Sequence, residues 1–291
     1  MTSTRTELST QQTTLKVALL RGDDFHNLYL ERLLGSRFEI TAVVSEPGRA
    51  QRRAIWRNRR WKDGVAAEYH RFRRSIIGKN RYRKRYFDPV HDNFSSSAAP
   101  RALEVADIND PRVGSYISAS GPEVCLITCT TKLSETTIRT IGVPIINIHG
   151  GHLPDYRGCH CFFMAINDGR FDAIGSTIHF VDAGLDTGDI IEIARPTIRP
   201  TDDAERLYSR AERLAAQRLV HWLEELENGR PIPRKPQAFR GRLVLRRHRT
   251  PRDDIAHWLR RRSGRLQIPA VTGSLPDHPW DIQPADDHEP T

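Results

Sequence analysis

The sequence of 291 residues predicts an α/β protein with a doubly wound, mostly parallel sheet. Short apolar, β-branched runs at residues 15–20, 38–44 and 124–129 are typical of buried strands. Residues 25–34, between the first two runs, have the pattern of a helix that ends at Gly35. Alternating strands and helices of this kind form βαβ units, and the length suits one large domain with appendages.

A basic and aromatic insertion interrupts this pattern at residues 48–95. From Arg49 to Arg85 the chain carries fifteen Lys or Arg residues and only two acids, Asp63 and Glu68. Aromatic side chains alternate with the arginines at spacings partly compatible with an amphipathic helix. The pattern leaves open whether this segment is a clamp over a nucleotide, a tRNA contact, a substrate lid or a solvated basic helix packed on the core.

The second half of the chain predicts a strand and turn at 101–110, strands at 143–148, 174–181, 190–194 and 241–246, and helices at 134–141, 161–167, 203–228 and 251–262. The predicted N-cap of the long helix is Asp202, and Gly229 ends it. We therefore divide the chain into a disordered tail (1–14), a large α/β domain (15–232), a C-terminal strand-and-helix extension (233–268) and a second disordered tail (269–291).

Polar side chains follow two of these strands. Asn147 and His149 are two residues apart at the end of the strand at 143–148, so they project to the same side. Asp186 lies in a glycine-containing loop beyond the strand at 174–181. Ligands bind at the carboxyl ends of strands in open α/β sheets. An amide donor, an imidazole and a carboxylate there can stabilise an oxyanion and move a proton.

Four motifs occur in order: Asn147-Ile-His149, Leu153-Pro154-Asp-Tyr156-Arg157-Gly158, His179-Phe-Val and Leu185-Asp186-Thr-Gly188-Asp-Ile-Ile. Together they resemble the N10-formyltetrahydrofolate-dependent formyltransferases, which include glycinamide ribonucleotide formyltransferase, the catalytic domain of methionyl-tRNA formyltransferase and the sugar N-formyltransferases. The resemblance is best over residues 124–229. It implies a Rossmann-like formyltransferase core, N10-formyltetrahydrofolate as the formyl donor, and transfer to a primary amine.

The resemblance also implies roles for single residues. The implied catalytic residues are Asn147, His149 and Asp186. The implied folate-binding residues are Thr130, Lys132, Leu133, Asp182, Ala183 and Gly184. We assign Tyr156 and Arg157 to holding the loop closed over the substrate, and His152 either to the amine substrate or to capping the turn. His179 either orients Asp186 or the folate, or is structural.

Two departures from the family's pattern narrow the range of acceptor molecules that we expect. Asp23 and Asp24 stand where glycinamide ribonucleotide formyltransferase places a glycine-rich phosphate loop, and two carboxylates would repel a phosphate. The roughly sixty residues after 231–233 are too few for the β-barrel domain of methionyl-tRNA formyltransferases. The expected acceptor is a small-molecule amine, an amino sugar or a natural-product intermediate, with a phosphorylated or nucleotide-linked form left open. The alternative functions are a formyltetrahydrofolate hydrolase and an RNA-binding protein built on a formyltransferase-like core. Whether the chain forms a homodimer is left open.

Composition sets further expectations. The net charge of +9 attracts polyanions or phosphorylated small molecules. No apolar run approaches the ~20 residues of a membrane span, and the first fifteen residues lack an apolar signal region, so we expect a cytoplasmic protein without a membrane partner. The four cysteines lack the Cys-x-x-Cys spacing of zinc sites, so we expect thiols and no metal.

Overall fold

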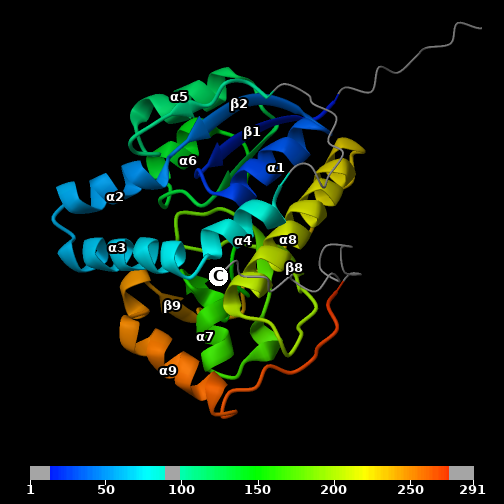
Figure 1. The fold of residues 1–291 in the computed structure, drawn as a ribbon. Helices are drawn as coiled ribbons and strands as arrows, with labels where there is room; N and C mark the ends of the chain where they lie inside the picture. The colour runs from blue at the N-terminus through cyan, green and yellow to red at the C-terminus, as the bar shows by residue number, and fades with distance from the viewer. Residues whose placement is uncertain (1–13, 89–98, 275–291) are drawn as a thin grey trace, which may run out of the picture.

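The structure is a computed structural model that describes residues 14–88 and 99–274. Its centre is a seven-stranded sheet in the order β3-β2-β1-β4-β5-β7-β8 (Figure 1). The strands are β1 Lys16–Arg21, β2 Glu39–Ser45, β3 Leu103–Glu104, β4 Val124–Thr128, β5 Ile145–His149, β7 Ser176–Phe180 and β8 Ile190–Ala194. The predicted tails lie almost wholly outside the described residues, although Val271 pairs with Ile198 and continues the ordered chain beyond residue 268.

The sheet is mostly parallel, which confirms the predicted fold class. The pairs β3–β2, β2–β1, β1–β4 and β4–β5 are parallel, whereas β7 is antiparallel to both β5 and β8. The chain leaves β1 toward β2 on one side and later returns as β4 on the other, so the strand order reverses beside β1. The carboxyl ends of β1, β4 and β5 meet at this point, where open α/β sheets bind their ligands.

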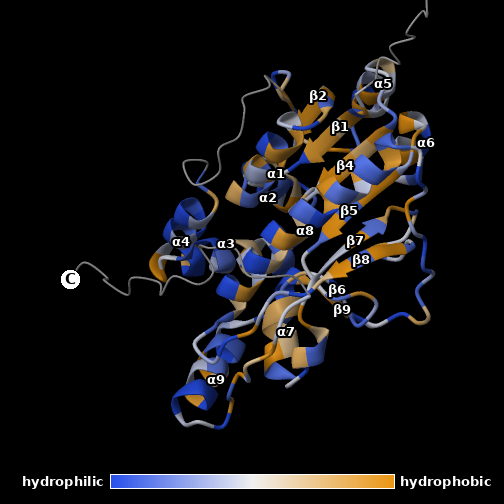
Figure 2. Ribbon diagram, turned by 90° about the vertical axis from the view of Figure 1, so that its right-hand side faces the viewer, coloured by the Kyte–Doolittle hydropathy of each residue, from blue (hydrophilic) through white to orange (hydrophobic). Residues whose placement is uncertain are grey.

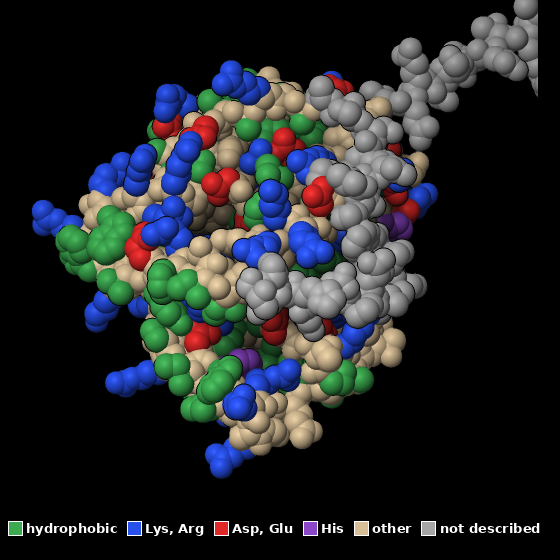
Figure 3. All heavy atoms as spheres, in the orientation of Figure 1, with side chains coloured by type: hydrophobic (Ala, Val, Ile, Leu, Met, Phe, Trp, Pro, Cys, Tyr) green, Lys and Arg blue, Asp and Glu red, His purple; other side chains and the backbone are tan. Residues whose placement is uncertain are grey.

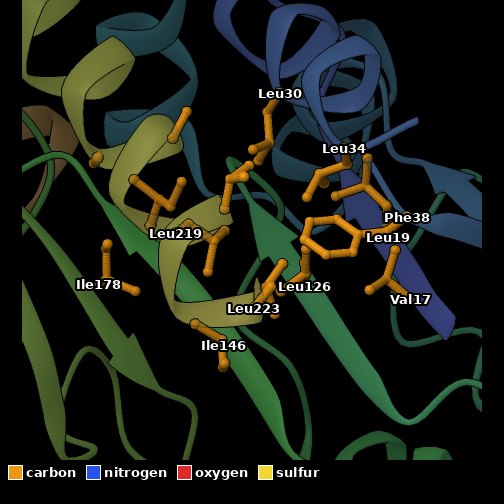
Figure 4. Packing of buried hydrophobic residues seen from close by; sticks show 14 of the residues in the cluster. Val17, Leu19, Leu30, Leu34, Phe38, Leu126, Ile146, Ile178, Leu219 and Leu223 are labelled. Atoms are coloured by element: carbon orange, nitrogen blue, oxygen red, sulfur yellow. The ribbon is translucent and has the colours of Figure 1, made fainter. Parts of the chain in front are cut away.

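Helices cover both faces of the sheet, as a doubly wound fold requires. Alternate residues of β1 point to opposite faces, with Val17 and Leu19 in one apolar cluster and Ala18 and Leu20 in the other. The first cluster packs under α1 (Phe25–Gly35) and α8 (Ala204–Glu227), as Figure 4 shows. The second packs under α5 (Pro111–Ala119) and α6 (Glu135–Ile141). Strands β1 and β4 are accordingly mostly hydrophobic (Figure 2).

Helix α8 begins one residue later than predicted. Asp203, not Asp202, is the N-cap, and its carboxylate accepts hydrogen bonds from the backbone N–H groups of Glu205 and Arg206. The buried carboxylate of Asp202 is turned elsewhere: it accepts the backbone N–H of Arg199 at 2.7 Å and pairs with Arg210 at 2.9 Å. The next acid therefore satisfies the first turn of the helix.

The basic insertion forms three helices, α2 (Gly48–Arg57), α3 (Trp61–Ile76) and α4 (Lys79–Tyr86). The C-terminal extension contains β9 (Arg242–Val244), the 3-10 turn η3 (Arg246–His248) and α9 (Pro251–Arg262), which confirms the predicted strand and helix. Strand β9 pairs in parallel with β6 (Tyr156–Gly158), just ahead of α7 (Cys161–Asn167) and the turn η2 (Phe171–Ala173). Because α3 contacts η3, insertion and extension meet on the same side of the sheet.

In the part of the chain that the structure describes, no helix is both long enough and apolar enough to cross a membrane.

Candidate active site

A cavity of 620 Å³ opens at the carboxyl ends of β1, β4 and β5. Its inner wall comes from the sheet and carries Asn147, His149 and Asp186. Its outer wall comes from α3 and from residues 244–249 of the extension. The three predicted catalytic side chains, which come from two separated segments, therefore face one common space.

Asn147 is oriented by a histidine on the neighbouring antiparallel strand. The register pairs Asn147 with His179, and Asn147 Nδ2 donates to His179 Nε2 at 3.0 Å. His179 Nδ1 donates to the carbonyl of Phe180 at 2.7 Å, which fixes the tautomer that accepts at Nε2. Burial lowers the pKa of His179 to about 4, so this acceptor stays unprotonated near neutrality. The second Nδ2 hydrogen of Asn147 remains for a ligand.

His149 is held from behind by backbone groups. Its Nε2 donates to the carbonyl of Tyr156 at 3.1 Å, which leaves Nδ1 as the free ring nitrogen. Nδ1 lies 3.6 Å from Asp186 Oδ2, too long for a hydrogen bond but close enough to attract an imidazolium. Behind the ring there is room only for glycine, because a Cβ at Gly151 would lie 2.7 Å from His149 Nε2 and from Cys161 Cβ.

Asp186 is held in a backbone conformation that few residues other than glycine adopt. Its φ is 54°, and its Oδ2 accepts the backbone N–H of Gly158 at 2.9 Å. Gly158 in turn pairs with Val244 of β9, so the extension helps to hold the loop that holds Asp186. Four non-glycine residues have positive φ in the described chain, and three of them, Cys129, His160 and Asp186, line the cavity. Strained backbone of this kind concentrates at functional sites.

These groups have the chemistry of acyl transfer. A free amide hydrogen on Asn147 can donate to an oxyanion without competing for a proton. The free Nδ1 of His149 can take a proton, and the Asp186 carboxylate stabilises the imidazolium that results.

Comparison with known proteins agrees with this geometry. A sequence profile of the formyl transferase family matches residues 17–223. The chain belongs to the formyl transferase family. The methionyl-tRNA formyltransferase of Caldanaerobacter subterraneus subsp. tengcongensis is 25% identical over 223 residues, which are 76% of this chain and 62% of that protein. The methionyl-tRNA formyltransferase of Methylibium petroleiphilum is 27% identical over 227 residues, which are 78% of this chain and 65% of that protein. The chain thus spans less than two thirds of the length of these relatives.

Solved structures share the fold of this formyl transferase. A sugar N-formyltransferase from Shewanella sp. matches with a TM-score of 0.51 and 14% identity, over 91% of this chain and 98% of that one. Glycinamide ribonucleotide transformylase 1 from Symbiobacterium toebii matches with a TM-score of 0.51 and 19% identity, over 81% of this chain and 99% of that one. At these identities the likeness extends to the fold alone.

Five of the six residues predicted to bind the folate line the cavity of this formyl transferase: Thr130, Lys132, Leu133, Asp182 and Gly184. Ala183 does not line it and points to solvent. Asp182 shapes the loop, because its Oδ1 accepts from Gly184 N at 2.9 Å and from Thr187 Oγ1 at 2.7 Å. The same end of the cavity is aliphatic, lined by Ile127, Leu133, Val181 and Leu185. A flat aromatic ring system fits such a lining.

The three residues predicted to bind substrate lie behind the cavity wall instead. His152 is buried between Asp155, at 3.1 Å from its Nδ1, and Arg195, at 2.8 Å from its Nε2. Tyr156 donates its hydroxyl hydrogen to Asp168 at 2.8 Å. Arg157 donates to the carbonyl of Leu185 at 3.4 Å and to that of Gly241 at 3.3 Å, which ties the Asp186 loop to the extension.

The outer wall is basic and carries residues that the sequence did not single out. Seven arginines line the cavity: Arg52, Arg60, Arg73, Arg74, Arg83, Arg246 and Arg249. Asp24 also lines the cavity, where Arg83 pairs with it and with Glu205. Arg74 forms no ion pair with any described residue, and burial, followed by repulsion from Arg83, lowers its pKa, while Asp24 and Glu205 act in the opposite direction. A half-buried guanidinium without an ion-pair partner favours an anionic ligand.

Two histidines whose rings pack at a tilt of 46° complete this wall. The rings of His70 and His160 lie 4.3 Å apart, centroid to centroid, and both line the cavity. His70 Nε2 donates to the carbonyl of Arg246 at 3.0 Å, so His70 Nδ1 is an acceptor without a partner, and His160 Nε2 also lacks one. Burial lowers the pKa of His70 to about 4 and that of His160 well below its usual value. Both imidazoles are therefore neutral near pH 7, and each keeps one buried ring nitrogen without a hydrogen-bond partner.

Among the residues of 14–88 and 99–274, no three His, Cys, Asp or Glu side chains are grouped in a way that could hold a metal ion. The cysteines at 125, 129, 159 and 161 are free thiols.

Proposed function

We propose that this formyl transferase moves a formyl group from N10-formyltetrahydrofolate to the primary amine of a small anionic molecule, and that this molecule is a nucleotide-linked amino sugar. The observation that carries the proposal is the opposition of two walls across one cavity. Asn147, His149 and Asp186 lie on one wall, and Arg74, which forms no ion pair with any described residue, lies on the other. A single acceptor molecule would then place its reacting amine at the first wall and its anionic group at the second.

The proposed transfer follows from the donors and acceptors described above. The amine nitrogen bonds to the formyl carbon, and the resulting oxyanion accepts the free Nδ2 hydrogen of Asn147. His149 Nδ1 takes the proton that the amine loses, while Asp186 stabilises the imidazolium at 3.6 Å. Cleavage of the bond between the formyl carbon and N10 then returns the proton to the leaving nitrogen, so that the enzyme ends in its starting state.

The aliphatic end of the cavity supports a folate as the donor. Ile127 and Asn147 are register partners on β4 and β5, so the apolar lining begins directly beside the oxyanion donor. Leu133, Val181 and Leu185 extend the lining across the loops after β4 and β7. A bicyclic ring held there would bring its formyl-bearing nitrogen close to Asn147 and His149.

The outer wall supports the assignment of the acceptor. Arg74, Arg52 and Arg246 line this wall and offer positive charge to a phosphate. A diphosphate is the anionic group that a nucleotide-linked amino sugar carries. Asp23 lines the cavity as well, and its carboxylate accepts the backbone N–H of Gly48 at 2.9 Å.

An aminoacyl-tRNA is the second candidate acceptor, because the relatives reported above are methionyl-tRNA formyltransferases and α2–α4 are strongly basic. The two acceptors predict different saturation behaviour. The KM of a nucleotide-linked sugar should rise when Arg74 is changed, whereas the KM of a tRNA should depend mainly on exposed arginines of α2.

The test is a screen of amines with N10-formyltetrahydrofolate that reads tetrahydrofolate release. We expect amine-dependent release with an amino-sugar nucleotide and none with His149→Ala. Release of formate at the same rate without an amine would instead identify a hydrolase and refute the transfer.

A further inference from the structure

The outer surface of α3 and α9, which we call the α3/α9 face, exposes large apolar side chains. Eight of the thirteen exposed large hydrophobic residues in the described chain lie there, at exposed fractions of 52–66%: Trp61, Val65, Phe72, Ile76, Ile77, Ile255, Trp258 and Leu259. The remaining five are scattered over other elements. Scattered apolar residues are ordinary on a protein surface, but a concentration of this size marks an interaction site.

The apolar side chains of α3 form a single stripe. Trp61, Val65, Phe72 and Ile76 recur at helical spacing, on the side opposite the buried residues Asp63, Ala67 and His70. The buried side of α3 lines the cavity, so the stripe faces away from it. On α9 the exposed residues Ile255, Trp258 and Leu259 are likewise three and four positions apart.

The two helices are tied together. Asp254 of α9 accepts a hydrogen bond from the Tyr69 hydroxyl at 2.5 Å and lies 3.7 Å from Arg73 of α3. Figure 3 shows hydrophobic side chains over both α3 and α9 on one face of the molecule, bordered by Lys and Arg side chains over α2. The stripes therefore form one surface and not two separate patches.

The charge around the α3/α9 face selects the kind of partner. Of the fifteen Lys and Arg residues at 49–85, five line the cavity and ten do not, against two acids, and α9 ends in Arg260, Arg261 and Arg262. A second copy of the chain would bring two such positive surfaces together, which is unfavourable. A nucleic acid would pair with the arginines but would gain nothing from aliphatic side chains such as Ile76 and Leu259. An anionic bilayer gains from both, because headgroups attract arginine while tryptophan and aliphatic residues enter the interface.

We propose that the α3/α9 face docks on the surface of an anionic lipid bilayer, with Trp61 and Trp258 as its interfacial anchors. The helices would lie on the membrane and not cross it. Docking would hold the outer cavity wall about one helix diameter, roughly 10 Å, from the headgroups. The proposal revises the expectation of no membrane partner and does not depend on the acceptor.

The test is co-sedimentation of the full chain with phosphatidylcholine vesicles that contain or lack 30% phosphatidylglycerol. We expect binding only with phosphatidylglycerol, and loss by about tenfold or more in the partition coefficient for Trp61→Ser with Trp258→Ser. Because Trp61 contacts the ring of Trp56 at 5.5 Å, Phe72→Ser with Ile76→Ser serves as an independent second pair. Phe239→Ser is the matched control, since Phe239 is 54% exposed outside the α3/α9 face.

Several results would overturn the proposal. One is that the wild type does not bind the anionic vesicles. Another is that both double variants bind as the wild type does while circular dichroism shows that they are folded. A switch from dimer to monomer in the double variants, measured by light scattering without vesicles, would assign the face to a second copy. RNA binding by the wild type that both double variants lose, together with no vesicle binding, would assign the face to nucleic acid.

Discussion

Replacing Asp186 by Asn removes one charge from the proposed site and little else. The Asn side chain keeps an oxygen that can accept the backbone N–H of Gly158, which Asp186 Oδ2 accepts at 2.9 Å. The loop should therefore keep its shape. What is lost is the attraction between the carboxylate and the imidazolium that forms on His149 during the reaction.

The geometry sets the size of this loss. At the 3.6 Å between His149 Nδ1 and Asp186 Oδ2, Coulomb's law with an effective dielectric constant of about 20 gives roughly 4–5 kcal/mol. The Asp186 side chain is only 10% exposed, so solvent screens this pair little. We expect kcat to fall by about 10³-fold, because each 1.4 kcal/mol corresponds to about a factor of ten.

The assay is tetrahydrofolate release under saturating donor and amine, with thermal unfolding measured in parallel. The matched control is Asp172→Asn, which removes an exposed acid that pairs with Arg170 outside the cavity. A folded Asp186→Asn protein that keeps more than a tenth of the wild-type kcat would show that the carboxylate does not stabilise a charged His149.

Three further predictions test the walls of the cavity and the core beneath it. Gly151→Ala should lower kcat by tenfold or more, because the added Cβ would lie 2.7 Å from His149 Nε2; an unchanged kcat in a folded variant would contradict the placement of the ring. Arg74→Gln should raise the KM of an anionic amine by about tenfold at constant kcat, because charge-assisted hydrogen bonds contribute about 1.5–3 kcal/mol. The control is Arg57→Gln, which lies outside the cavity and should leave the KM unchanged. Equal effects of the two substitutions would assign the anion to the outer surface. Burial raises the pKa of Glu212 to about 7, so the folded protein should lose stability as pH rises from about 4.5 to 7. Glu212→Gln should therefore raise the free energy of unfolding by about 3 kcal/mol at pH 8 but not at pH 4.5. Denaturant unfolding at the two pH values measures this difference, and an equal effect at both would contradict the prediction.

Much of the fold could be predicted because the core strands are uninterrupted apolar runs. The run Val124–Thr128 is buried at every position, and only a strand covered on both faces uses such a run. The pairing of β7 was not readable, because nothing local in Ser176–Phe180 tells whether it lies parallel or antiparallel to β5. That direction places His179 opposite Asn147, so the role of His179 had to come from the structure.

The candidate site was predicted in its centre and missed at its edges. Asn147 and His149 share a strand, so their common direction follows from the two-residue period alone. His152 looked equally available, yet Asp155 and Arg195 take both of its ring nitrogens. For the basic insertion the sequence left a clamp, a tRNA contact, a lid and a solvated helix open, because a run of arginines does not reveal that Arg74 lines the cavity.

The central claim is that Asn147, His149 and Asp186 together transfer a formyl group to an amine. Its most direct test is a single-turnover reaction of wild-type protein and Asn147→Ala with N10-formyltetrahydrofolate and the best amine from the screen, analysed by mass spectrometry. We predict one formylated amine for each tetrahydrofolate released by the wild type, and a rate lower by about 10²–10³-fold in the variant. Tetrahydrofolate release without formylated amine, or an equal rate in Asn147→Ala, would contradict the account.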